Sequence, residues 1–123
     1  MHPVPIPARK ALFWVLLLAV AVGSLLPVDY LPPQAFDLWD KAQHALGFLA
    51  LALAGTWAHP RRNARQTVAL ATGLLAFGAA IEIAQAFTGW RQGDGQDLLA
   101  DAIGLAAGLA LARIACDRRL ATK

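Results

Sequence analysis

Apolar runs about as long as a lipid bilayer is thick occupy most of this chain. We expect four of them, over residues 11–26, 40–58, 67–87 and 97–115. An α-helix rises about 1.5 Å per residue, so about 20 apolar residues cross the roughly 30 Å of hydrocarbon in a bilayer. A soluble domain needs no such runs, and the 123-residue chain is 58% hydrophobic but only 15% charged. We therefore predict an all-α integral membrane bundle of four transmembrane helices.

Positive charge gathers in three of the segments that flank these runs. Nine of the eleven Lys and Arg residues are Arg9, Lys10, Arg61, Arg62, Arg65, Arg113, Arg118, Arg119 and Lys123. The other two connections hold only Lys41 and Arg91, against Asp29, Asp37, Asp40, Asp94 and Asp97, and basic segments stay in the cytoplasm. We therefore expect both termini to be cytoplasmic, with Tyr30, Trp39 and Trp90 as aromatic anchors at the outer interface. Cations in short clusters, rather than along one face, give no indication of a nucleic-acid partner.

The predicted organisation is a cytoplasmic leader at 1–10, a transmembrane domain at 11–116 and a cytoplasmic tail at 117–123. The first run also has the features of a signal peptide: Arg9 and Lys10 form a basic n-region, followed by an apolar h-region and a cleavage site at Ala21-Val22-Gly23. We favour retention of this run as a helix, because cleavage would remove a packing partner from the other three.

Ionisable residues lie inside three of the runs, towards their outer ends. Each costs about 2.5 to 3.5 kcal/mol at a helix centre on insertion scales, so such residues face the bundle interior and mark function. Helical spacing places them on the same faces as glycines, which let helices approach closely. We therefore predict that these faces meet in a polar pocket that opens outward, with Lys41 and Arg91 at its rim. The predicted ligand-binding residues are Asp40, Lys41, His44, Glu82, Gln85, Arg91, Asp97 and Asp101.

These residues also have purely structural interpretations. A buried Glu82 bonded to a neighbouring helix would hold the bundle together, and His44 would be a simple hydrogen-bonded residue. Asp40 and Asp97 suit helix starts, where acids cap the backbone and complement the helix dipole. The Gly104-x-x-x-Gly108 pair indicates packing within the chain, with a homo-oligomer as the alternative.

Several of these residues follow one another in a specific order. The chain contains Asp40-Lys41-x-x-His44-x-x-x-Phe48, then Glu82-x-x-Gln85, then Arg91, Asp97, Gly104 and Gly108. This order resembles the VanZ-like family of small bacterial membrane proteins over about residues 25–115. The resemblance implies a multi-pass protein of the bacterial cytoplasmic membrane. The family's founding member is linked to reduced teicoplanin susceptibility, which implies a role in the cell envelope and in antibiotic resistance. Asp101 stands where the family usually has asparagine.

Binding is the function that we expect of the pocket. The partners would be membrane lipid and a lipid-linked or peptidoglycan-related ligand, with Arg91 and Lys41 holding a phosphate or carboxylate. No cofactor is expected.

An intramembrane enzyme is the alternative, with His44, Glu82 and Asp97 as its catalytic residues. His44 and Glu82 would act as acid and base, or these three residues with Asp101 would hold a divalent metal. The spacing matches no recognised ligand set such as His-Glu-x-x-His, so we expect no metal. Ion translocation is less favoured, because the inner halves of the runs carry no ionisable path.

Overall fold

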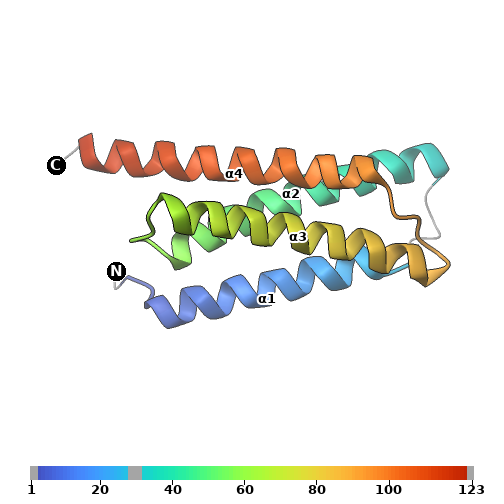
Figure 1. Cartoon of the computed structure of the whole chain (residues 1–123), viewed down its shortest axis with the longest axis horizontal. Helices are drawn as coiled ribbons and strands as arrows, with labels where there is room; N and C mark the ends of the chain where they lie inside the picture. The colour runs from blue at the N-terminus through green and yellow to red at the C-terminus, as the bar shows by residue number, and fades with distance from the viewer. Residues whose placement is uncertain (1–2, 28–31, 122–123) are drawn as a thin grey trace.

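A computed structural model describes residues 3–27 and 32–121, and these form four helices that alternate in direction (Figure 1). The helices are α1 (Ile6–Leu25), α2 (Pro33–Ala58), α3 (Ala64–Thr88) and α4 (Gly95–Ala121). The all-α prediction is confirmed. The described ends of the chain lie at the same end of the bundle. Of the residues used above to orient the chain, Asp29, Tyr30 and Lys123 lie outside the described residues.

Capping side chains define where α3 and α4 begin. The side chain of Asn63 accepts a hydrogen bond from the Gln66 backbone, and the Gln66 side chain accepts one from the Asn63 backbone, so the two form a capping box. Asp94 caps α4 by accepting a hydrogen bond from the Gln96 backbone N–H at 2.9 Å. Asp97 lies in the first turn of α4, where an acid complements the helix dipole as expected, but its interpretation as the cap is wrong, because Asp94 supplies the capping oxygen. That of Asp40 is also wrong, because α2 already begins at Pro33.

Three of the helices, α1, α3 and α4, are long and apolar enough to cross a membrane. Their outer surfaces expose large apolar side chains along most of their length, for example Trp14, Leu18, Ile83, Phe87, Ile103 and Leu111. An extended apolar surface of this kind is stable against lipid but not against water. The chain is therefore a multi-pass membrane protein.

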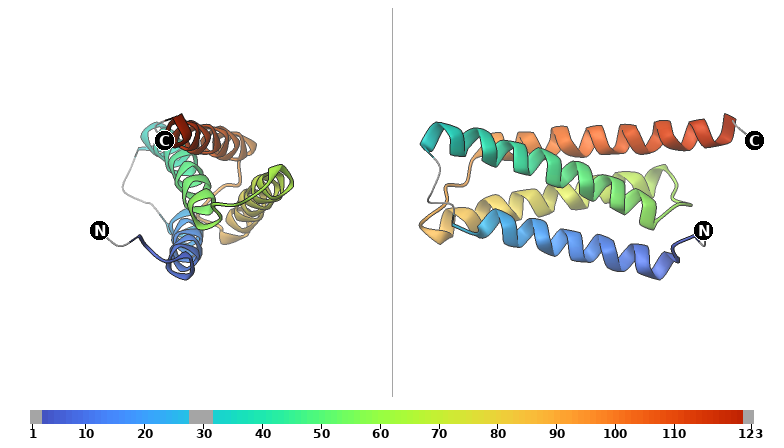
Figure 2. Two further views of the ribbon diagram at one scale, coloured as in Figure 1. Left: turned by 90° about the vertical axis from the view of Figure 1, so that its left-hand side faces the viewer. Right: turned by 180° about the vertical axis from the view of Figure 1, so that it is seen from behind.

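The helix that does not reach this hydropathy is α2, although we expect a span at 40–58. Figure 2 shows α2 in the middle of the bundle, between α1 and α4. Phe48, Leu51 and Ala52 of α2 are each 0% exposed. In the first half of α2, the polar residues Asp40 and His44 are also buried, as expected of ionisable groups that face the interior of a membrane bundle.

Glycines bring α2 and α4 into close contact. A Cβ atom at Gly104 would collide with the backbone carbonyl of Ala45, and one at Gly108 would lie 2.6 Å from the Leu49 carbonyl oxygen. The Gly104 and Gly108 face therefore packs against α2 of the same chain, as the packing interpretation predicted. This contact brings the polar residues on α2 and α4 together.

Candidate functional site

His44 lies at the centre of a buried polar cluster in the half of the bundle away from the chain ends. It is 2% exposed, and its Nδ1 atom lies 2.8 Å from Oδ1 of Asp101, which is 0% exposed. A carboxylate accepts, so the imidazole Nδ1–H donates this hydrogen bond. On the other side of the ring, Nε2 lies 3.8 Å from Oε1 of Glu82, beyond hydrogen-bonding distance. Helices α2, α3 and α4 thus each supply one member of the cluster.

Arg91 and Asp40 form a second buried pair above this cluster. Nη2 of Arg91 donates to Oδ1 of Asp40 at 2.7 Å, and Arg91 is only 5% exposed. The prediction that Arg91 lies at the rim is therefore wrong. The chain turns back after α3 at Gly89, whose φ of 79° is in the left-handed region that favours glycine, and this turn carries Arg91 inward over the helix ends.

Lys41 is the cation that does lie at the rim. Its Nζ atom pairs with the Asp37 carboxylate, lies 3.4 Å from Oδ2 of Asp94, and lies 3.7 Å from Oδ1 of Asp97. Carboxylates from α2, α4 and the loop between α3 and α4 therefore share this one ammonium group. Arg91 is likewise paired with Asp40, so the carboxylates in the site outnumber its cations.

Asp94 is a site residue that the sequence reasoning missed. Its backbone N–H donates to Oε2 of Glu82 at 2.7 Å, which holds that carboxylate against the loop. The pKa of Asp94 is lowered, because its charged form accepts a hydrogen bond from the Gln96 backbone and lies near the Lys41 ammonium. An aspartate just before an apolar run is an N-cap signal, and this signal could have identified it.

Gln85 does not join the cluster, although the sequence grouped it with Glu82. Its side chain is fully buried and its Nε2 atom donates to the carbonyl oxygen of Ser24 on α1 at 2.8 Å. Nearby, Nε1 of Trp90 donates to the carbonyl oxygen of Leu25 at 3.0 Å. These two hydrogen bonds hold the end of α1 against α3 and against the loop after α3. Gln85 therefore connects two helices and does not line the acidic cleft.

A cleft of about 570 Å³ lies above the cluster, at the end of the bundle opposite the chain ends. It is lined by Asp37, Asp40, Trp90, Arg91, Gln92, Gly93, Asp94 and Asp97. Four aspartates and one arginine make its wall acidic. Trp39 and Trp90 are exposed at this end of the bundle, where we expect outer-interface anchors.

Two overlapping groups of side chains offer ligand atoms close enough to share one metal ion. They are Asp40, His44 and Asp97, and His44, Glu82 and Asp101, with the ligand atoms of each group within 4.8 Å of one another. Among residues 3–27 and 32–121, several of these atoms find no hydrogen-bond partner although they are buried, namely His44 Nε2, Glu82 Oε1, Asp97 Oδ1 and Asp101 Oδ2. Buried polar groups are rarely left this way, so these atoms mark a place where a ligand is expected.

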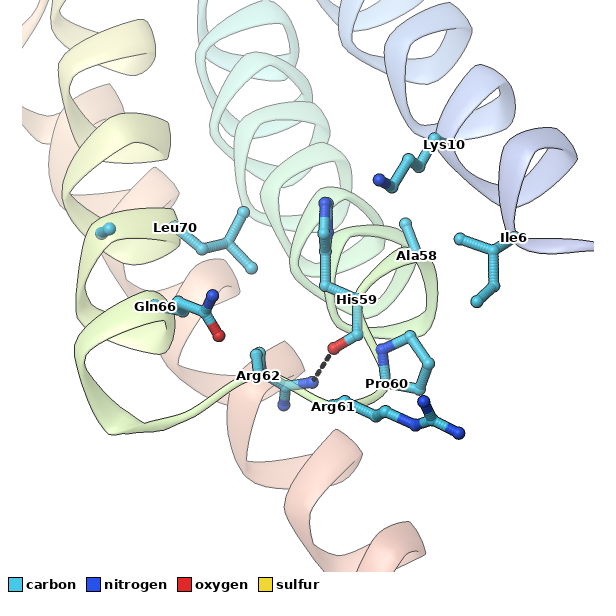
Figure 3. A pocket seen from close by; sticks show the side chains of 10 residues that line it. Ile6, Lys10, Ala58, His59, Pro60, Arg61, Arg62, Gln66 and Leu70 are labelled. Atoms are coloured by element: carbon cyan, nitrogen blue, oxygen red, sulfur yellow. Dashed lines mark hydrogen bonds between the residues drawn. The ribbon is translucent and has the colours of Figure 1, made fainter.

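A second cavity, of about 490 Å³, lies at the opposite end of the bundle, and Figure 3 shows the side chains around it. Lys10 from α1 and Arg61 and Arg62 from the α2–α3 connection lie beside apolar side chains such as Ile6 and Leu70. Nη1 of Arg62 donates to the carbonyl oxygens of Thr56, at 3.1 Å, and His59, at 3.5 Å. This end of the bundle is therefore basic, and the cavity contains none of the predicted site residues.

Comparisons of the chain with protein-family models, with curated proteins and with solved structures found no match.

Proposed function

We propose that this chain is a VanZ-like protein of the bacterial cytoplasmic membrane that crosses the bilayer four times. The direction of the helices supports the fourth crossing. Helices α1 and α3 run the same way along the bundle, and a chain that crosses the bilayer with both of them would return between them through α2 (Figure 1). Helix α2 has 26 residues, which at about 1.5 Å per residue is long enough for that return.

The unequal charge of the two ends supports cytoplasmic termini. Lys10, Arg61 and Arg62 gather at the end where the described chain begins and finishes, whereas the acidic cleft lies at the other end. Basic segments remain in the cytoplasm during insertion, so the cleft opens to the outside of the cell.

The cleft binds a ligand rich in hydrogen-bond donors. Both nearby cations, Arg91 and Lys41, already face carboxylates, so a phosphate group would meet a surplus of negative charge. This argues against the expectation that these two residues hold an anion. Hydroxyl, amide and ammonium groups suit aspartate acceptors, and the saccharide and peptide parts of a lipid-linked or peptidoglycan-related ligand carry all three. The excess of aspartate on the cleft wall is the observation that carries this proposal.

Ligand-linked thermal shift of the purified protein tests this function. The probe is the disaccharide-pentapeptide headgroup of the peptidoglycan precursor, in free and in lipid-linked form. We expect either form to raise the melting temperature of the wild type. The Asp97→Asn variant should lose the shift, whereas the matched Asp117→Asn variant, changed at an exposed position far along α4, should keep it. An undiminished shift in Asp97→Asn would place binding elsewhere.

The resemblance to the VanZ-like family adds teicoplanin susceptibility to the proposal. Expression of the chain in a susceptible host should raise the inhibitory concentration of teicoplanin, and Asp97→Asn should abolish the rise. An unchanged concentration with wild-type protein would remove the antibiotic link while leaving the cleft proposal to the thermal-shift result.

An intramembrane enzyme is the second candidate, and the His44–Asp101 pair favours it. A carboxylate on Nδ1 orients the imidazole and leaves Nε2 free to accept a proton from a bound hydroxyl or water, as a general base does. Mass spectrometry of the lipid-linked probe after incubation tests this role. Turnover that His44→Gln abolishes without loss of binding would support the enzyme, and an unaltered probe would rule it out for this ligand.

A further inference from the structure

We infer that His44, Glu82 and Asp97 bind a divalent transition-metal ion at the floor of the cleft, with Asp101 orienting the imidazole. This departs from the sequence-based expectation that the chain holds no metal, which rested on the lack of a recognised ligand spacing. The ligands come from three different helices, so no short spacing could have revealed them. The site does not depend on which cell-envelope ligand occupies the cleft.

The imidazole of His44 is the first reason. Asp101 accepts the Nδ1–H at 2.8 Å, which fixes the tautomer and leaves a lone pair on Nε2. Nε2 is buried and has no hydrogen-bond partner in the part of the chain that the structure describes. Metal-binding histidines usually have their other nitrogen bonded to a carboxylate or carbonyl, which orients the ring and raises its basicity. His44 therefore has both the free nitrogen and the orienting partner of a metal ligand.

The Glu82 carboxylate lies where a second ligand belongs. Its Oε1 atom is 3.8 Å from Nε2 of His44 and, like that nitrogen, is buried without a hydrogen-bond partner among the described residues. Two ligands of a tetrahedral zinc ion at about 2.0 to 2.2 Å lie about 3.3 to 3.6 Å apart, so a small rotation of either side chain brings the two atoms into range. The other oxygen of Glu82 is held by the backbone N–H of Asp94 at 2.7 Å, so the carboxylate is fixed with Oε1 turned towards His44.

Asp97 supplies the third ligand. His44 is common to the two groups of ligand atoms that each lie within 4.8 Å of one another, and Asp97 belongs to one group whereas Glu82 belongs to the other. Among the described residues, Oδ1 of Asp97 has no hydrogen-bond partner. Asp40, the other acid of the group that contains Asp97, already accepts a hydrogen bond from Arg91. Lys41, 3.7 Å from Oδ1 of Asp97, is the competing cation, and it keeps Asp37 and Asp94 as partners when a metal binds.

One nitrogen and two carboxylates favour ions such as Zn²⁺ or Co²⁺ over Mg²⁺ and Ca²⁺, which prefer oxygen ligands alone. Two carboxylates also match the charge of a divalent ion. Three protein ligands leave a fourth position open for water or for a ligand group that enters from the cleft.

Zinc titration of the purified, chelator-treated protein by calorimetry tests the site, with no cell-envelope ligand present. We expect wild type to bind one Zn²⁺ per chain. His44→Gln and Glu82→Gln should each weaken binding by at least about 100-fold, and Asp101→Asn by about 10- to 100-fold, because it alters only the orienting partner. Asp117→Asn, at an exposed acid far along α4, and His59→Gln, at the other end of α2, are the matched controls and should bind as wild type does.

Cobalt spectroscopy of the wild type keeps the test independent of variants that fail to fold. X-ray absorption of the Co²⁺-loaded protein should show one imidazole and otherwise oxygen ligands. Absence of stoichiometric binding, absence of the imidazole, or binding that survives both His44→Gln and Glu82→Gln would overturn the metal site. The thermal shift with the disaccharide-pentapeptide in metal-free protein reports on the proposed function separately, so the two can fail independently.

Discussion

His44 and Asp101 lie 57 residues apart in the chain, yet their side chains meet at 2.8 Å between α2 and α4. The close approach of these helices at Gly104 makes this contact possible, because the backbones are near enough for two short polar side chains to touch. Packing and chemistry in this protein therefore depend on the same helix pair.

Replacement of Asp101 tests the role of this contact in stability. Asp101→Leu leaves the Nδ1–H of His44 buried without an acceptor, which should cost about 1 to 3 kcal/mol of unfolding free energy. Asp101→Asn retains an acceptor oxygen and should cost clearly less. Unfolding in mixed micelles measures both. Equal losses in the two variants would mean that the hydrogen bond contributes nothing.

Gly104→Ala should destabilise the bundle, because the new methyl group meets the carbonyl of Ala45 on α2. Overpacking of this kind costs about 1 to 3 kcal/mol. Gly73→Ala is the matched control within another helix, since a Cβ atom there meets nothing within 4 Å. The same unfolding assay applies. A Gly104→Ala variant as stable as Gly73→Ala would contradict the close α2–α4 contact.

The pair of Arg91 and Asp40 should show strong coupling in a double-mutant cycle. Removal of one partner leaves the other charge buried, so Asp40→Asn or Arg91→Gln alone should cost about 3 to 5 kcal/mol. The double variant should lose much less than the sum of the two. Arg61→Gln, at an exposed position, controls for the loss of a cation and should have little effect. Additive losses would show that the two side chains act independently.

The charge of Asp94 should make stability depend on pH in the acid range. Its pKa is lower in the folded protein than in the unfolded chain, so it contributes stability above the unfolded value, and that contribution disappears as the pH falls through the folded value. Asp94→Asn keeps a capping oxygen for Gln96 but loses the charge near Lys41. Melting curves of both proteins should differ at neutral pH and converge in acid. A constant difference across that range would disprove the charge effect.

Much of the site could be predicted from helical spacing alone. Spacings of four residues placed Asp40 with His44, and Asp97 with Asp101, on the glycine-bearing faces of their helices. The contacts of His44 with Asp101 and Glu82 confirm that these faces meet. The pattern works because a charge inside an apolar run has few places to go except the bundle interior.

The loop between α3 and α4 accounts for most of what the sequence could not predict. The burial of Arg91 depends on the turn at Gly89, and the contact of Asp94 with Glu82 depends on the path of that loop. Gly93 lets the loop pass close to α3, since a Cβ atom there would lie 2.5 Å from the Glu82 carbonyl oxygen. Gln85 was misplaced because a helical pattern gives a residue's face but not which neighbouring helix covers it.

The proposed binding of a cell-envelope ligand requires that the acidic cleft open to the outer side of the membrane. Cysteine labelling measures this directly, once the exposed Cys116 has been changed to alanine. Gln92→Cys places a thiol on the cleft wall, and Ala64→Cys places one at the basic end, both at exposed positions. In intact cells, a membrane-impermeant maleimide should label the Gln92→Cys protein, and it should label the Ala64→Cys protein only after permeabilisation. The reverse pattern would place the cleft in the cytoplasm and contradict the proposed function.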